Sequence, residues 1–280
     1  MNLRKAERQH ARIKIGLQGP AGSGKTMGAL LVAFGITGDW SKIAIIDTEN
    51  HSADLYAHLG EYFVISMEAP YSPERFITAL TTCEAGGMEV IIIDSISHEW
   101  GGIGGILETH NNMPGNSYMN WAKVTPRHNQ FLNALISSKC HIIATIRTKQ
   151  DYILSEKNGK LVPEKIGFKG IQREGINYEL TLVFELGVNQ QASTAKDRTG
   201  LFLNKPAFQL GVDIGNTIKN WCDQVSEKAV LEMINQCSNI SSLRETFNAY
   251  PQFQILLNEK FQARKQELSL VDKDLNNLKT

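Results

Sequence analysis

The stretch "GPAGSGKT", residues 19–26, constrains the fold of this chain more than any other part of its sequence. It fits the pattern G-x-x-x-x-G-K-[ST] at every defined position, follows a β-rich run, and precedes an apolar stretch, residues 27–34, that can begin a helix. In such a strand–loop–helix unit, the loop N–H groups and the positive end of the helix dipole face one anion. An ordinary glycine-rich turn is the alternative, but it does not require these flanking elements. The stretch therefore predicts a site for the phosphates of a nucleotide.

The loop residues would make different contacts with a bound nucleotide. Gly22 and Gly24 let the backbone wrap so that successive N–H groups point inward. Lys25 can reach the outer phosphates of ATP, and the Thr26 hydroxyl can ligate Mg²⁺. The candidate nucleotide contacts in this segment are Gly19, Pro20, Ala21, Gly22, Ser23, Gly24, Lys25, Thr26 and Met27.

The pattern of apolar runs predicts an α/β fold. Short β-rich runs alternate with helical stretches, which indicates βαβ units, a mainly parallel sheet and helices on both faces. The expected strands are residues 13–17, 43–47, 62–66, 90–94 and 141–146. Residues 178–204 read as strands joined by tight turns, an antiparallel extension of the same sheet. We expect residues 1–224 to form this core with a basic amino-terminal segment.

Residues 225–280 are expected to form a small helical appendage and a tail. Ser242 and Glu245 fit a capping box, and Leu243 and Phe247 would share one face of the helix that follows. Residues 256, 257 and 261 give a second apolar stripe.

Two carboxylates follow strands that should end beside the loop. Asp94 ends the apolar run "VIIID", where it can hold Mg²⁺ through water together with Thr26. Glu49 comes out of the carboxyl end of residues 43–47, where ligands of open α/β sheets collect. Glu49 could orient the attacking water or accept its proton, or it could merely cap the next helix.

Together, the loop, "IIDTENHSADLY", "VIIIDS" and "IIATIRTK" resemble the RecA-type recombinase core. The resemblance implies that Glu49 is the catalytic base and that Tyr56 stacks on adenine; Tyr56 as a core residue is the competing interpretation. It also implies a nucleotide contact at Thr145, where RecA-type proteins carry a glutamine that couples nucleotide to DNA. Threonine is shorter, and Arg147 follows two residues later, so the coupling is either replaced or weaker.

The finer resemblance is to phage nucleotide-binding proteins with a shortened RecA core, associated with single-strand annealing and recombination. It covers about residues 3–204, including "HIIATIRTKQDY", "GIQREGINYELTLVFEL" and "KDRTG". It implies a homo-oligomer, a ring or a filament, with ATP at the subunit interface. Lys196 and Arg198 would then act on the nucleotide of the neighbouring subunit, whereas an exposed hairpin paired with Asp197 or Asp213 is the alternative.

Single-stranded DNA is the predicted partner. The 29 basic and 29 acidic residues cancel, so a polyanion must be held by a local patch. Residues 147–173 carry seven basic and three acidic residues with aromatics and glycines, as a mobile DNA-binding loop would, although a solvated β-extension fits too. A second excursion, residues 98–121, has almost no positive charge, and its histidines lack metal-ligand spacing. The candidate DNA contacts are Arg147, Lys149, Lys157, Lys160, Lys165, Lys169 and Arg173.

These features predict a RecA-like protein that binds and hydrolyses ATP with Mg²⁺ and acts on single-stranded DNA in recombination, annealing or repair. The alternatives are a nucleotide-dependent scaffold or loader without DNA-stimulated hydrolysis and a small-molecule P-loop kinase. No long apolar run or signal peptide is evident, and four scattered cysteines suggest a reducing compartment. We therefore expect no membrane segment and a cytoplasmic location, in a host's cytoplasm if the chain is phage-encoded.

Overall fold

The computed structural model of the protein describes residues 11–157, 160–223 and 227–277. Contacts divide the chain into two compact units. The larger unit covers Arg12–Asn220, and the smaller contains Trp221–Thr280.

A single sheet organises the larger unit, with strand order β3-β2-β4-β5-β1-β7-β8. Its parallel strands are β1 (Lys14–Gly19), β2 (Ile43–Asp47), β3 (Phe63–Ser66), β4 (Val90–Asp94), the first part of β5 (His141–Lys157), and β7 (Leu182–Leu186). β8 (Ala192–Asp197) runs antiparallel to β7. The predicted α/β class, with a mainly parallel sheet and an antiparallel extension, is confirmed.

Helices cover both faces of this sheet. Alternate residues of β4, such as Ile91 and Ile93, point into a core with Phe76 of α2 (Pro73–Ala85) and Phe131 of α5 (Ser117–Ser137). The intervening residues of β4 face the other way, where α1 (Lys25–Thr37) packs against the strand. Every residue of β2 and β4 is buried, as expected for strands covered on both sides. The shorter elements are η2 (Trp40–Lys42), η3 (Ser52–Leu59), α3 (Ser97–Gly101), α4 (Ile106–Asn111), α6 (Ile176–Glu179) and α7 (Val212–Cys222).

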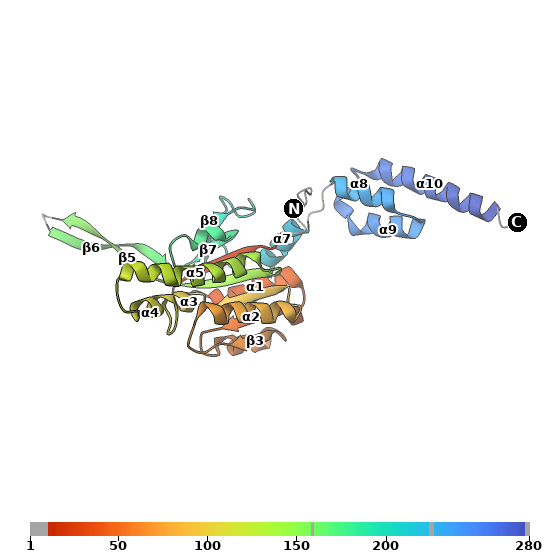
Figure 1. Ribbon diagram of the computed structural model, residues 1–280. Coiled ribbons are helices and arrows are strands. Elements are labelled where there is room, and N and C mark those ends of the chain that lie inside the picture. The colour runs from red at the N-terminus through yellow and green to blue at the C-terminus, as the bar shows by residue number, and fades with distance from the viewer. Residues whose placement is uncertain (1–10, 158–159, 224–226, 278–280) are drawn as a thin grey trace. The chain divides into compact units, whose positions relative to one another are not determined.

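The segment expected to be a mobile loop after β5 is instead a β-hairpin. β5 continues past the sheet and pairs antiparallel with β6 (Lys160–Gly170), as Figure 1 shows. The pairing has one irregularity, between Asp151 and Tyr152. The backbone hydrogen bonds of this segment are therefore satisfied by strand pairing, as the alternative of a solvated β-extension required and the mobile loop did not.

The smaller unit consists of α8 (Glu227–Gln236), α9 (Ile240–Ala249), η4 (Pro251–Phe253) and α10 (Asn258–Asn277). Its own core includes Leu243 and Phe261. The predicted capping box was misplaced. The Asn239 side chain accepts from the Ser242 N–H and the Ser242 side chain reaches back to Asn239, so α9 begins three residues earlier than expected. Asn caps helices as well as Ser does, which makes the two registers hard to separate from sequence.

Glycine brings two helices of the larger unit into close approach. A Cβ at Gly215 on α7 would lie 2.2 Å from the Val32 carbonyl oxygen and 2.7 Å from Gly35 Cα, both on α1. We expect Gly215→Ala to lower the free energy of unfolding by about 1–3 kcal/mol through overpacking, measured by urea denaturation. Gly86→Ala is the matched control, because the nearest atom to its Cβ would be 3.4 Å away. Equal stability of the two variants would contradict the tight crossing.

A buried histidine makes stability sensitive to acid. His141 begins β5, and its Nδ1 accepts from the Ile13 N–H at 3.2 Å. Burial, with Arg12 and Lys14 nearby, lowers the pKa of His141 to about 4. Below pH 6.5 His141 becomes protonated in the unfolded chain, whereas in the folded chain it stays neutral down to about pH 4. Stability is therefore lost as the pH falls from 6.5 to about 4.

We expect His141 to account for a loss of about 2 kcal/mol between pH 7 and pH 5. Urea denaturation at the two pH values would measure it. His141→Gln retains an acceptor for the Ile13 N–H but cannot titrate, so it should lose about 2 kcal/mol less over the same interval. An identical pH dependence in both proteins would show that His141 is not the responsible group.

Candidate nucleotide site

The carboxyl ends of the parallel strands bring the predicted site residues to one edge of the sheet. Asp47 at the end of β2 is in register with Asp94 at the end of β4, and Gly19 of β1 with Arg147 of β5. A cavity of about 500 Å³ opens at this edge. Its lining includes Gly22, Lys25, Thr26, Glu49, Asp94 and Arg147.

The loop that follows β1 wraps as its glycines predict. Gly22 and Gly24 have φ of 78° and 82°, a left-handed conformation that other residues rarely adopt, and Gly24 precedes the first turn of α1. Lys25 Nζ donates to the carbonyl oxygens of Gly19 at 2.9 Å and Pro20 at 2.7 Å. Burial lowers the pKa of Lys25, while the nearby carboxylates of Asp94 and Glu49 oppose that shift. The loop thus presents a cation and a helix amino terminus to the cavity.

A threonine pair fixes both oxygens of Asp94. Thr26 Oγ1 donates to Oδ2 at 2.6 Å, and Thr145 Oγ1 donates to Oδ1 at 2.5 Å. The carboxyl group is buried, which raises the pKa of Asp94, and the bonds from Thr145 and Thr26 act in the opposite direction. Thr145, predicted as a nucleotide contact, thus contacts Asp94, the candidate Mg²⁺ ligand. The Thr26 hydroxyl and the Asp94 carboxylate supply oxygen donors of the kind that Mg²⁺ prefers, so these two residues fit such an ion.

Glu49 is held by an arginine from another strand. Arg147 Nε donates to Glu49 Oε1 at 2.6 Å, and a second guanidinium nitrogen pairs with Oε2. The N-cap of η3 is His51, which makes no side-chain cap hydrogen bond. Asp47, and not Glu49, accepts from the backbone N–H groups of this segment, those of Glu49 at 2.6 Å and Ala53 at 2.9 Å. Arg147, predicted to contact DNA, lies in the nucleotide cavity.

Comparison with known proteins assigns the part of the chain that contains this site to a family. The model of the AAA domain family matches residues 11–232. The chain belongs to the AAA domain family. Its AAA domain is of the P-loop NTPase type, and it contains the sheet, the loop and both cavity carboxylates. A search of curated proteins gave no match.

Sequence reasoning missed a cluster beside the site in the AAA domain. Thr48 Oγ1 lies 2.6 Å from His98 Nδ1, and Thr48 Oγ1 also accepts from the Ser95 N–H at 2.8 Å. Tyr71 stacks on His98 with ring centroids 4.8 Å apart. Burial and the charge of Arg147 lower the pKa of His98. The cluster ties the residue before Glu49 to the end of β4, but its members lie too far apart in sequence to form a motif.

The two predicted cations near the end of β8, Lys196 on the strand and Arg198 just after it, are not in the cavity lining of the AAA domain. Lys196 Nζ donates to the carbonyl oxygens of Asn177 at 2.6 Å and Tyr178 at 2.8 Å. Asp197 accepts from the backbone of the turn that follows, including the Gly200 N–H at 2.9 Å. The Arg198 side chain is exposed, and the structure gives it no hydrogen bond or ion pair with the described residues.

The remaining predicted residues are dispersed over the AAA domain. Tyr56 is half-buried on η3 and does not line the cavity. Lys149 is exposed on β5, Lys169 forms an ion pair with Glu174, and Arg173 is half-buried. Lys157, Lys160 and Lys165 lie outside the residues whose side chains are described. Over the described part of the chain, no helix is both long and apolar enough to cross a membrane.

Proposed function

We propose that the protein is a RecA-type ATPase that hydrolyses ATP between subunits and acts on single-stranded DNA in phage-type recombination, annealing or repair. One observation carries this proposal: the carboxylate that shares the cavity with Lys25 and Asp94 is Glu49, which lies two residues after the end of the neighbouring strand β2. The residue after Asp94 is Ser95, so β4 itself does not supply an adjacent acid. The resemblance to the RecA-type core assigns the catalytic base to this position just after β2.

The residues of the site have complementary roles in this proposal. The loop N–H groups and Lys25 bind the phosphates, and Thr26 and Asp94 hold Mg²⁺. The ion, when bound, neutralises charge on the phosphate oxygens. Glu49 lines the cavity, and in this proposal its carboxylate orients the attacking water and accepts its proton. Its bond with Arg147 keeps the carboxylate in one orientation.

Arg147 links hydrolysis to the β5–β6 hairpin in this scheme. Thr145 on Asp94 and Arg147 on Glu49 both come from β5, and the same strand continues into the hairpin. A ligand that displaces the hairpin would move both contacts together. This arrangement would replace the glutamine that RecA-type proteins use between nucleotide and DNA.

The DNA half of the proposal depends on charge at the hairpin. Basic residues there would bind phosphates, which makes binding weaken steeply as salt rises. The experiment is ATP turnover with and without single-stranded DNA at 50 and 200 mM salt. We expect stimulation at the lower concentration and its loss at the higher. Turnover that single-stranded DNA leaves unchanged at both concentrations would leave an NTPase without this partner.

Glu49→Gln tests the catalytic assignment. Glutamine preserves size and can still accept a hydrogen bond from Arg147, but it is a poor base, so we expect ATP turnover to fall by about 10²–10⁴-fold. ATP binding, measured by titration calorimetry, should change little. Asp54→Asn on the neighbouring exposed η3 is a matched control that should retain activity. Full turnover by Glu49→Gln would exclude it as the base.

A further inference from the structure

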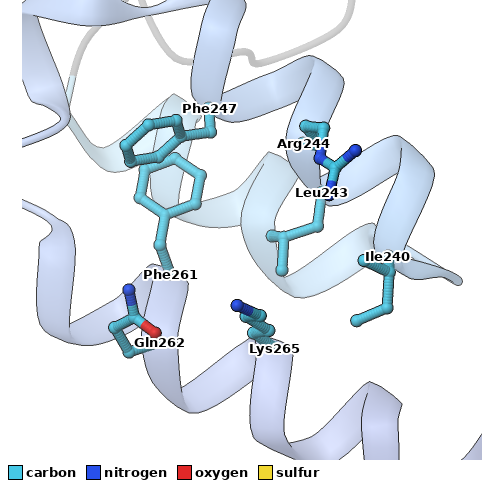
Figure 2. A pocket seen from close by; sticks show the side chains of 7 residues that line it. All are labelled: Ile240, Leu243, Arg244, Phe247, Phe261, Gln262 and Lys265. Carbon is cyan, nitrogen blue, oxygen red and sulfur yellow. The ribbon is translucent and has the colours of Figure 1, made fainter.

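The small helical unit has a cavity that the proposed ATPase chemistry does not use. It lies between α9 and α10, and Figure 2 shows its side chains converging from these helices. Its volume is about 180 Å³. The wall residues that matter here are Ile240, Leu243, Phe247, Phe261, Arg244 and Lys265.

The inner part of this α9–α10 groove is apolar. Leu243 and Phe261 are almost fully buried, and the Phe247 ring stands edge-on to Phe261 with centroids 5.0 Å apart. An apolar protein cavity of about 150 Å³ is large enough to accept a benzene ring. The groove can therefore take one aromatic or large aliphatic side chain.

The rim of the groove is cationic. Arg244 on α9 and Lys265 on α10 are both exposed, and neither forms an ion pair within the described part of the chain. Arg264 differs, because it pairs with Glu267 at 2.7 Å and donates to the Cys237 carbonyl oxygen at 2.8 Å. Two cations without an ion pair among the described residues, one from each helix, thus flank an apolar slot, and a partner that buries a side chain there would place carboxylates beside them.

We propose that the α9–α10 groove binds an acidic peptide segment of a partner protein, with one aromatic or large aliphatic side chain in the slot and carboxylates on Arg244 and Lys265. The groove residues lie beyond residues 11–232, which the AAA domain family matches, so this function is separate from the ATPase core. An apolar anchor with a charged rim is a common design for recognising short segments.

Fluorescence anisotropy with the full-length protein tests this proposal. The probe is a fluorescein-labelled peptide in which four aspartates precede a single phenylalanine. We expect binding that weakens with salt, and a loss of about 10-fold or more in the double variant Arg244→Glu, Lys265→Glu. Serine in place of the peptide phenylalanine should weaken binding by about 10-fold or more. Lys260→Glu, an exposed site on the same helix outside the groove, is the matched control.

Several results would overturn the proposal. These are absence of peptide binding, equal binding by the charge-reversed protein, and equal binding of the serine peptide. A labelled oligonucleotide that binds in place of the peptide and is lost on charge reversal would make the rim a nucleic-acid contact. Self-association that the charge reversal abolishes, seen by sedimentation, would assign the groove to a second copy. ATP turnover should be the same in all these variants, which separates this test from that of the proposed ATPase.

Discussion

Replacing Arg198 by alanine is expected to lower ATP turnover of the assembled protein by about 10³-fold. Charge spreads over the γ-phosphoryl oxygens as the bond breaks, and a cation delivered by a neighbouring subunit stabilises that charge. Arg198 is exposed at the end of β8, while Asp197 beside it is occupied by the turn backbone and Lys196 by two carbonyl oxygens. Arg198 is thus the cation of this strand end with the most freedom to reach another molecule.

Mixing variants distinguishes action between subunits from action within one. Arg198→Ala and Lys25→Ala should each be inactive alone, but a mixture should recover part of the activity. Some interfaces then combine an intact loop from one chain with an intact arginine from the other. Lys139→Ala, an exposed cation just before the amino end of β5, serves as the control and should turn over ATP normally. A mixture as inactive as its components would contradict the shared site.

Lys25→Ala should remove both nucleotide binding and turnover. Lys25 lines the cavity with Thr26 and is the one cation in the loop of residues 19–26. Loss of one such charge-stabilising donor typically lowers kcat by about 10²–10³-fold, and weaker binding adds to the effect at low ATP. Turnover over a range of ATP concentrations, together with calorimetric binding, would separate the two contributions.

Folding must be checked in the same variant, because Lys25 also donates to two loop carbonyls. The circular dichroism spectrum should match that of the parent protein, and the free energy of unfolding from urea denaturation should lie within about 1 kcal/mol of the parent's value. Normal ATP binding and turnover in a well-folded Lys25→Ala protein would remove the basis of the nucleotide site.

Local sequence patterns predicted two buried strands and the turn conformation of the phosphate loop. The strands at residues 43–47 and 90–94 were predicted to the residue, because uninterrupted apolar runs end at an aspartate in each. The loop glycines were likewise predictable, because their positive φ has few other solutions. Contacts between segments distant in the sequence were not predictable in this way. Arg147 meets Glu49 across 98 residues, and Thr48 meets His98 across 50, so neither pair has a spacing signature.

The hairpin shows a different limit of sequence reading. Residues 147–173 are polar and interrupted by glycines, which left a loop and a β-extension both open, and the strands satisfy each other's backbone by pairing. β-propensity depends strongly on such neighbours and is weakly encoded in single segments. The same applies to α9, where Asn239 and Ser242 are both acceptable caps and only the structure selects the register.

The unbroken course of β5 has a thermodynamic consequence. Thr145 and Arg147 lie on the strand that continues into the hairpin, so a ligand whose binding shifts β5 would be coupled to nucleotide binding by one coupling free energy. Linkage requires that energy to be equal in both directions. If an oligonucleotide raises the affinity for ATP by some factor, ATP must raise the affinity for the oligonucleotide by that same factor. Hydrolysis of ATP would then promote release of the oligonucleotide.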